Sequence, residues 1–159
     1  MLTVCDGEGF GHLTLCPETM GKIGQLGDLE EVLELCTLSR RLTPCIDFGH
    51  LYARSLGRTQ GEEETARVLD RLEAALGPER ASRFHSHFSM IEFTPGGGEK
   101  LHLTFGQSRF GPDYAPLCRQ LALRDWGPTV ICESRGTQAE DALTMKRAYG
   151  DFLRKVGKP

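Results

Sequence analysis

Acidic and imidazole side chains end several short apolar runs of this 159-residue chain. Glu18 ends "LTLCPE", Asp47 lies in "PCIDFGH", His87 lies in "FHSHFS" and Glu133 ends "TVICE". Such groups are costly at the ends of buried strands unless something pairs with them, and one divalent cation would bind all four. The pattern predicts a metal site with a carboxylate and imidazole shell suited to Zn²⁺, Mn²⁺ or Mg²⁺.

Strands and helices that alternate along the chain would bring these residues together. The segments 12–18, 42–50, 83–93 and 128–133 are strand-like, and each ends near a candidate ligand. The candidates are separated by roughly 30 to 45 residues, which is room for one crossover between parallel strands. We therefore expect an α/β fold whose site lies at the C-terminal ends of a parallel sheet. The predicted helices cover 28–41, 61–77, a short stretch from 113, and 139–157.

Four motifs in order resemble those of the endonuclease IV group, apurinic/apyrimidinic endonucleases within the xylose isomerase-like TIM-barrel superfamily. They are "PETMGKIGQLG", "CIDFGH", "HSHFS" and "ICESRGTQAEDAL". The resemblance covers residues 12–159 and implies a deoxyribonuclease IV-like enzyme that hydrolyses phosphodiesters at abasic sites during DNA repair. It also implies divalent metals, with zinc expected first and manganese or magnesium as alternatives.

The resemblance assigns roles to six residues. Glu18 is similar to the glutamate that bridges two metals, and Asp47 and His50 match a D-x-x-H motif. His87 matches the histidine that opens an H-L-N-D segment, and Glu133 matches the glutamate of the last metal-binding strand. His102, in "GEKLHLTFG", resembles the histidine of a D-x-H pair. The implied ligands are thus Glu18, Asp47, His50, His87, His102 and Glu133, with Glu18 and Glu133 also the candidate catalytic residues.

Two departures from the family pattern concern a third metal ion, which the resemblance also implies. Lys100 stands two positions before His102, where the resemblance expects an aspartate, and Phe88 to Met90 follow His87 in place of Leu-Asn-Asp. His50 and His102 therefore lack their expected partner. A (β/α)8 barrel takes about 250 residues, whereas this chain holds about four βα units. We expect an incomplete TIM barrel: residues 1–11 are a partial strand or linker, and 12–159 are the C-terminal half.

Three functions remain open. Closely spaced metals at this site would activate water and stabilise the leaving oxygen of a phosphodiester. A single metal would instead polarise the carbonyl and hydroxyl of a small sugar, with Glu18 or Glu133 moving a proton on carbon, as in an isomerase or epimerase. The third possibility is a non-catalytic fragment. A homodimer that completes the barrel would bury the open strand edges.

Simpler interpretations apply to individual residues. Glu18 and Glu133 could cap helices, and Asp47 could fix the His50 tautomer. His85 is expected to face away from His87 and to be structural. Five cations near the predicted site end could bind phosphate: Lys22, Arg54 and Arg135, together with Lys100 and Arg109. They are weak candidates, because single surface cations are more often solvated.

The composition sets outer limits. A formal charge of −3 gives no overall electrostatic footprint for nucleic acid. The chain has no run of about 18 apolar residues and no signal-peptide pattern, so we expect no membrane association and a cytoplasmic location. The six cysteines are scattered without a C-x-x-C pair, and we expect them to be reduced.

Overall fold

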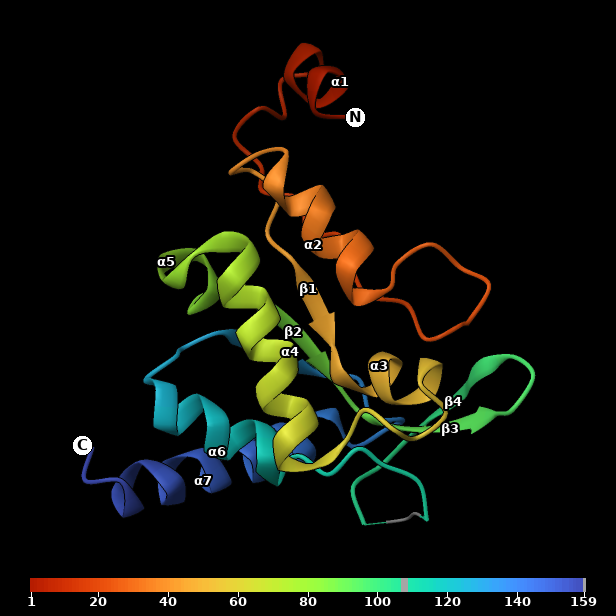
Figure 1. The fold of residues 1–159 in the computed structure, drawn as a ribbon, viewed down its shortest axis with the longest axis vertical. Helices are drawn as coiled ribbons and strands as arrows, with labels where there is room; N and C mark the ends of the chain where they lie inside the picture. Colours follow the sequence, from red (N-terminus) through yellow and green to blue (C-terminus); the bar gives the residue numbers. More distant parts are fainter. Residues whose placement is uncertain (107–108, 159) are drawn as a thin grey trace.

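A central parallel sheet covered by helices forms the body of the molecule (Figure 1). The computed structural model describes residues 1–106 and 109–158. Its three-stranded sheet has the order β1-β2-β5, and both strand pairs are parallel. The α/β class and the parallel sheet predicted from the sequence are confirmed. The strands are β1 (Cys45–Asp47), β2 (His85–Phe88) and β5 (Thr129–Cys132), and a separate hairpin pairs β3 (Met90–Thr94) with β4 (Gly98–Leu103).

Helices α2, α4, α6 and α7 lie near the predicted positions, whereas α1, α3 and α5 were not predicted. The capping box is present in α2, since Asp28 accepts from the Glu31 N–H while the Glu31 side chain accepts from the Asp28 N–H. Gly77 ends α4 with φ of +77°, a conformation that favours glycine. The bounds are α1 Leu2–Gly7, α2 Leu29–Thr37, α3 Phe48–Arg54, α4 Gly61–Leu76, α5 Pro78–Ala81, α6 Ala115–Arg124 and α7 Gln138–Lys155.

The hydrophobic core lies between one face of the sheet and the helices. Ile46 and Phe88 from the strands pack with side chains from the surrounding helices, including Leu69 of α4, Leu117 of α6 and Met145 of α7. The opposite face of the strands carries Asp47 and His87. One face of the sheet is thus covered by helices, and the other is left for the polar residues.

Residues 15–19 run parallel to residues 42–45 but do not form a complete strand. Two isolated bridges join Leu15 to Leu42 and Glu18 to Cys45. Pro17 lies between them and has no N–H to donate to the neighbouring segment, so the ladder is interrupted there. The predicted strand 12–18 is thus reduced to a paired segment, but Glu18 still lies beside β1.

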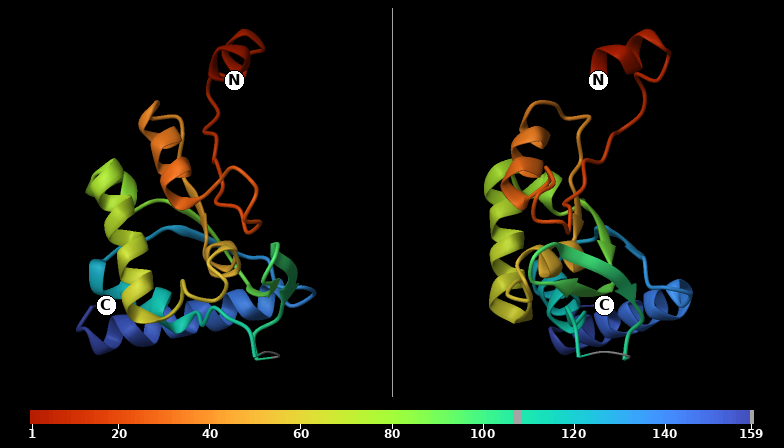
Figure 2. Two further views of the ribbon diagram at one scale, coloured as in Figure 1. Left: turned by 45° about the vertical axis from the view of Figure 1, so that its right-hand side comes forward. Right: turned by 90° about the vertical axis from the view of Figure 1, so that its right-hand side faces the viewer.

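Three other predictions differ from the structure. The segment 42–50 is not one strand, because the chain enters helix α3 directly after Asp47, and His50 is therefore helical. The segment 83–93 divides at Ser89 into β2 and the hairpin strand β3. The N-terminal residues, expected as a partial strand or linker, contain helix α1, which stands away from the body in the views of Figure 2.

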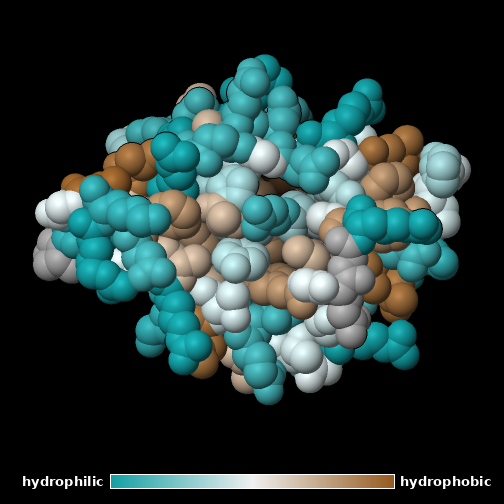
Figure 3. All heavy atoms as spheres, turned by 90° about the horizontal axis from the view of Figure 1, so that it is seen from below, coloured by the Kyte–Doolittle hydropathy of each residue, from teal (hydrophilic) through white to brown (hydrophobic). Residues whose placement is uncertain are grey.

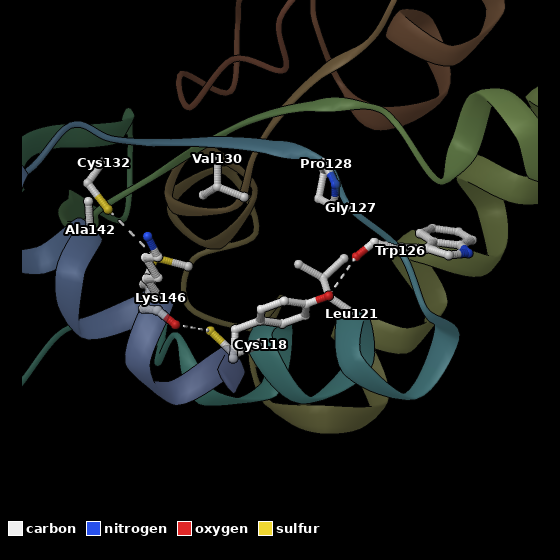
Figure 4. Close-up of a pocket in the computed structure, with 11 residues that line it drawn as sticks. Cys118, Leu121, Trp126, Gly127, Pro128, Val130, Cys132, Ala142 and Lys146 are labelled. Carbon is white, nitrogen blue, oxygen red and sulfur yellow. Dashed lines mark hydrogen bonds between the residues drawn. The ribbon is translucent and has the colours of Figure 1, made fainter. Parts of the chain in front are cut away.

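A cavity of about 230 Å³ lies between α6, α7 and β5 (Figure 4). Its lining is mainly apolar, and a hydrogen bond from the Tyr149 hydroxyl to the Trp126 carbonyl crosses one end at 3.4 Å. Within the described residues, no helix combines the length and apolar character that crossing a membrane requires.

Candidate metal centre

The structure brings four sequence-predicted ligands into one cluster at the C-terminal ends of the parallel strands. Glu18 follows the paired segment, Asp47 ends β1, His87 lies in β2 and Glu133 directly follows β5. One potential ligand atom from each lies within 4.8 Å of the others. We call these residues the carboxylate set. The strand register places Asp47 beside His87, which explains how residues distant in sequence meet.

His87 is the only nitrogen donor of the carboxylate set. Its Nδ1 lies 3.0 Å from Glu18 Oε1 and 3.3 Å from Glu133 Oε1. Two carboxylates thus converge on one imidazole nitrogen from opposite edges of the sheet. A divalent cation among these atoms would replace close contacts between like-charged oxygens with attraction.

Asp47 provides the strongest local indication of a cation. The residue has 0% exposure, and its Oδ1 accepts the His50 N–H at 2.8 Å, which makes Asp47 the N-cap of α3. Its Oδ2 is buried with no hydrogen-bond partner among the described residues, and the His50 Nδ1 is 3.5 Å away. Burial raises the pKa of Asp47. A buried carboxylate oxygen without a hydrogen bond is costly, so a cation fits this position well.

A second cluster adjoins the first and contains His50, Glu99 and His102. One potential ligand atom from each lies within 4.8 Å of the others. Glu99 lies between the two histidines, since its carboxylate oxygens are 3.5 Å from His50 Nε2 and 3.6 Å from His102 Nε2. We call these residues the hairpin set, because Glu99 and His102 belong to β4.

The expectation that His50 and His102 lack an acidic partner was wrong, because Glu99 takes that place. The sequence search stopped at Lys100, two positions before His102. The hairpin pairs Glu92 with Leu101 and Phe93 with Glu99, so Lys100 is an extra residue in a β-bulge. A bulge lets residues three apart face the same side of a strand, which brings Glu99 and His102 together.

Both histidines of the hairpin set have their Nδ1 atoms held by the protein. His50 Nδ1 lies 2.8 Å from the Thr19 carbonyl, to which it donates, and His102 Nδ1 is joined to the Ser89 hydroxyl at 2.8 Å. The Nε2 atoms consequently face Glu99. Histidine ligands in metal sites are commonly oriented by such a bond at the other nitrogen.

His50 also links the two clusters electrostatically. Its Nδ1 is 3.4 Å from Glu18 Oε1 and 3.5 Å from Asp47 Oδ2. Burial lowers the pKa of His50, but Asp47, the Thr19 carbonyl, Glu99 and Glu18 together outweigh burial and raise it overall. The carboxylate and hairpin sets therefore form one continuous acidic centre with two adjacent groups of potential ligands.

Glycines allow the backbone to approach this centre closely. A Cβ on Gly21 would lie 2.7 Å from the Glu99 Cβ and 3.1 Å from the His50 Cδ2. A Cβ on Gly49 would lie 2.6 Å from the Ser89 carbonyl oxygen. These positions need glycine because the loop after Glu18 and the start of α3 both pack against the hairpin that carries Glu99.

The predicted phosphate-binding cations differ in their surroundings. Lys22 and Arg135 are exposed on loops that follow Glu18 and Glu133. Arg54 Nη1 donates to the carbonyls of Lys22 at 2.8 Å and Gln25 at 2.9 Å, so it holds the loop after Glu18 in place. Lys100 pairs with Glu92 at 2.6 Å.

His85 was expected to face away from His87, but in the structure both side chains lie on the same face of β2. Residues two apart on a strand share a face, and the two rings lie with centroids 5.2 Å apart. The exposed face of β2 therefore carries two histidines in succession.

Comparison with known proteins agrees with this architecture. The family model described as the xylose isomerase-like TIM barrel matches residues 4–155. The uncharacterized protein MJ0133 of Methanocaldococcus jannaschii is 39% identical over 135 residues, which is 85% of this chain and 48% of that protein. The chain thus spans about half the length of the curated relative that it matches. No solved structure matches it. With its parallel strands and strand-end ligands, the chain belongs to the xylose isomerase-like TIM barrel family.

Proposed function

We propose that this chain carries the metal-binding part of a phosphodiesterase of the deoxyribonuclease IV type, acting in the cytoplasm on DNA with abasic sites. The observation that carries the proposal is the contiguity of the carboxylate and hairpin sets, which share the surroundings of His50. Two adjacent donor sets favour a reaction that uses more than one cation. Divalent cations bound there would supply water activation and stabilise charge on a leaving oxygen.

The residues of the chain have separate tasks under this proposal. Glu18, Asp47, His87 and Glu133 would hold one or two cations, and His50, Glu99 and His102 would hold a further one. Glu18 of the carboxylate set also lies near the hairpin set, since its Oε1 is 3.4 Å from His50 Nδ1 and 3.0 Å from His87 Nδ1. Lys22 and Arg135, which are exposed on the loops that follow Glu18 and Glu133, would contact a phosphate beside the centre.

The testing experiment combines metal content with cleavage. Protein purified without chelators would be analysed for bound metal per chain, then incubated with a duplex carrying one abasic site and with an intact duplex. We expect two or more divalent cations per chain and cleavage only of the abasic strand. Zinc is the expected metal, with manganese and magnesium as alternatives.

Two variants separate catalysis from simple loss of folding. Glu133→Gln removes a carboxylate from the centre, and we expect cleavage to fall at least about a hundredfold, as for lost metal ligands or their partners. Glu140→Gln in the first turn of α7 removes an acidic side chain outside both sets and should leave cleavage unchanged. Equal cleavage by wild type and Glu133→Gln would exclude the proposal.

A single-metal isomerase or epimerase of a small sugar is the second candidate. The observation that favours it is the scarcity of free positive charge at the centre, because Arg54 is engaged by backbone carbonyls, Lys100 is paired with Glu92 and the formal charge of the chain is −3. DNA binding needs such cations and weakens strongly with salt. One bound metal per chain and no DNA affinity at low salt would select this candidate, with Glu18 or Glu133 moving the proton.

We also propose that a second copy of this chain covers the open side of the sheet. Within the described residues, β5 pairs only with β2, so its outer edge has free backbone groups. Ile131 on this strand is 46% exposed. Open parallel edges invite pairing with another chain, and two half barrels would supply the strands of a closed one. A chain that binds no metal in any assembly would instead be a non-catalytic fragment.

A further inference from the structure

A third group of potential ligands lies beside the carboxylate set on the same face of the sheet. It consists of Cys45, His85 and His87, and one potential ligand atom from each lies within 4.8 Å of the others. We call it the thiol set. The register pairs Cys45 directly with His85 across β1 and β2, and His87 follows two residues later on the same face.

The geometry is close to what a small cation requires. Around a tetrahedral zinc ion, with Zn–S of about 2.3 Å and Zn–N of about 2.0 to 2.1 Å, ligand atoms are about 3.5 Å apart. Cys45 is 2% exposed, while the two histidines are half-buried. Because the thiol is fixed by burial, closing on an ion would require rotation of the His85 and His87 imidazoles.

The donor chemistry of the thiol set differs from that of the carboxylate set. One sulfur and two imidazole nitrogens favour soft or borderline cations such as Cd²⁺, Co²⁺ and Zn²⁺, whereas three carboxylates and one imidazole favour hard cations such as Mn²⁺ and Mg²⁺. Burial raises the pKa of the Cys45 thiol, so a cation bound there must displace its proton.

We propose that Cys45, His85 and His87 form a second, thiophilic position that takes soft divalent cations and competes with the carboxylate set for His87. His87 belongs to both sets. A cation held by all three residues of the thiol set would therefore draw the only histidine of the carboxylate set away from Glu18 and Glu133. The centre has in this way two alternative positions for a cation, selected by the softness of the ion. This inference concerns metal binding and does not depend on which reaction the centre performs.

Metal-binding spectroscopy tests the position without measuring activity. Co²⁺ would be titrated into metal-free protein while the sulfur-to-cobalt charge-transfer absorption in the near ultraviolet is recorded, and Cd²⁺ affinity would be measured by competition. Mn²⁺ affinity would be measured separately by electron paramagnetic resonance. We expect the charge-transfer band in wild type, and we expect Cd²⁺ to displace Mn²⁺.

Three variants assign the signals. Cys45→Ser should abolish the band and weaken Cd²⁺ binding at least about tenfold, while Mn²⁺ affinity stays within about twofold, because the carboxylate set is untouched. Cys132→Ser is the matched control, since Cys132 is a buried thiol on β5 outside the set, and it should keep the band. Asp47→Asn should show the reverse pattern, with weakened Mn²⁺ binding and a retained band.

His85→Asn provides a test that leaves every thiol in place. It should weaken Cd²⁺ binding and shift the cobalt absorption, again without affecting Mn²⁺. A band that survives in Cys45→Ser, or cobalt bound by wild type without any sulfur band, would overturn the proposal. Simultaneous binding of Cd²⁺ and Mn²⁺ would overturn the competition for His87.

Discussion

Gly21 shows at the scale of one residue how closely the backbone approaches the centre. Its position leaves no room for a methyl group between the loop and the side chains of Glu99 and His50. We expect Gly21→Ala to push Glu99 away and to lower the metal content per chain by one cation, as measured by elemental analysis. Gly24→Ala is the control, because a Cβ there would meet nothing within 4 Å. Unchanged metal content in Gly21→Ala would show that the hairpin set holds no cation.

Asp47→Asn tests the roles of the two Asp47 carboxylate oxygens separately. Asparagine still caps α3 through its side-chain oxygen, but it removes the charge at the buried Oδ2. We therefore expect the metal-free variant to be at least as stable as wild type, while the rise in Tm on adding Mn²⁺ becomes much smaller. Thermal unfolding with and without metal measures both effects.

The control for Asp47→Asn is the N-cap of another helix, which belongs to none of the three ligand sets. Asp28→Asn changes the N-cap of α2 in the same way, and it should keep the full metal-induced rise in Tm. If both variants lost the same part of that rise, the effect would come from helix capping and not from metal binding.

The carboxylate set was predictable residue by residue, and in the hairpin set His50 and His102 were predicted from the family resemblance, whereas Glu99 was not. Glu18, Asp47, His87 and Glu133 end apolar runs, and parallel strands bring such ends together. Glu99 has no such context, because its proximity to His102 depends on the bulge at Lys100. A bulge depends on pairing between two strands, and a pattern within one strand does not reveal it.

Among the elements, Arg80 connects helix α5 to the end of α2. Its Nη2 donates to the carbonyl of Cys36 in the last turn of α2 at 2.8 Å and to that of Leu42 beyond the helix at 2.7 Å, which satisfies these backbone acceptors. Arg80→Ala should lower the free energy of unfolding by about 1 to 3 kcal/mol, since it leaves partly buried acceptors unpaired. Urea unfolding of metal-free protein measures this loss.

Arg40→Ala is the matched control for Arg80→Ala. Arg40 pairs with Glu79 at 3.4 Å, but both side chains are at least 80% exposed. Such exposed pairs contribute little, so we expect a change of less than about 0.5 kcal/mol. Equal losses in the two variants would mean that the carbonyl contacts of Arg80 add nothing beyond surface charge.

Helices were easier to predict from the sequence than strands. The apolar positions of α2 and α4 repeat with the helical period, and Asp28 and Gly77 mark where those helices begin and end. The segment 83–93 has a uniform strand-like pattern, which hid the break at Ser89. The signal for the hairpin was "TPGGG", a turn sequence between two strand-like stretches.

For the whole molecule, the exposed edge of β5 makes association testable. Figure 3 shows hydrophobic side chains both toward the middle and at the edges of one face, among hydrophilic ones. If a second copy covers the open side of the sheet, Ile131→Glu on β5 should convert a dimer to a monomer, as measured by light scattering. Leu143→Glu on α7 is the control, because Leu143 is 45% exposed, nearly the same as Ile131, but lies on a helix. A monomeric wild-type protein would contradict the dimer.

The N-cap role of Asp47 also bears on the coordination number of a cation in the carboxylate set. Because Oδ1 already accepts the His50 N–H, Oδ2 is the Asp47 oxygen that would bind a cation. With one atom each from Glu18, His87 and Glu133, the protein then supplies four donors. Four donors saturate Zn²⁺ but leave about two positions on an octahedral ion such as Mg²⁺. A cation that prefers six ligands would thus keep positions for solvent and substrate.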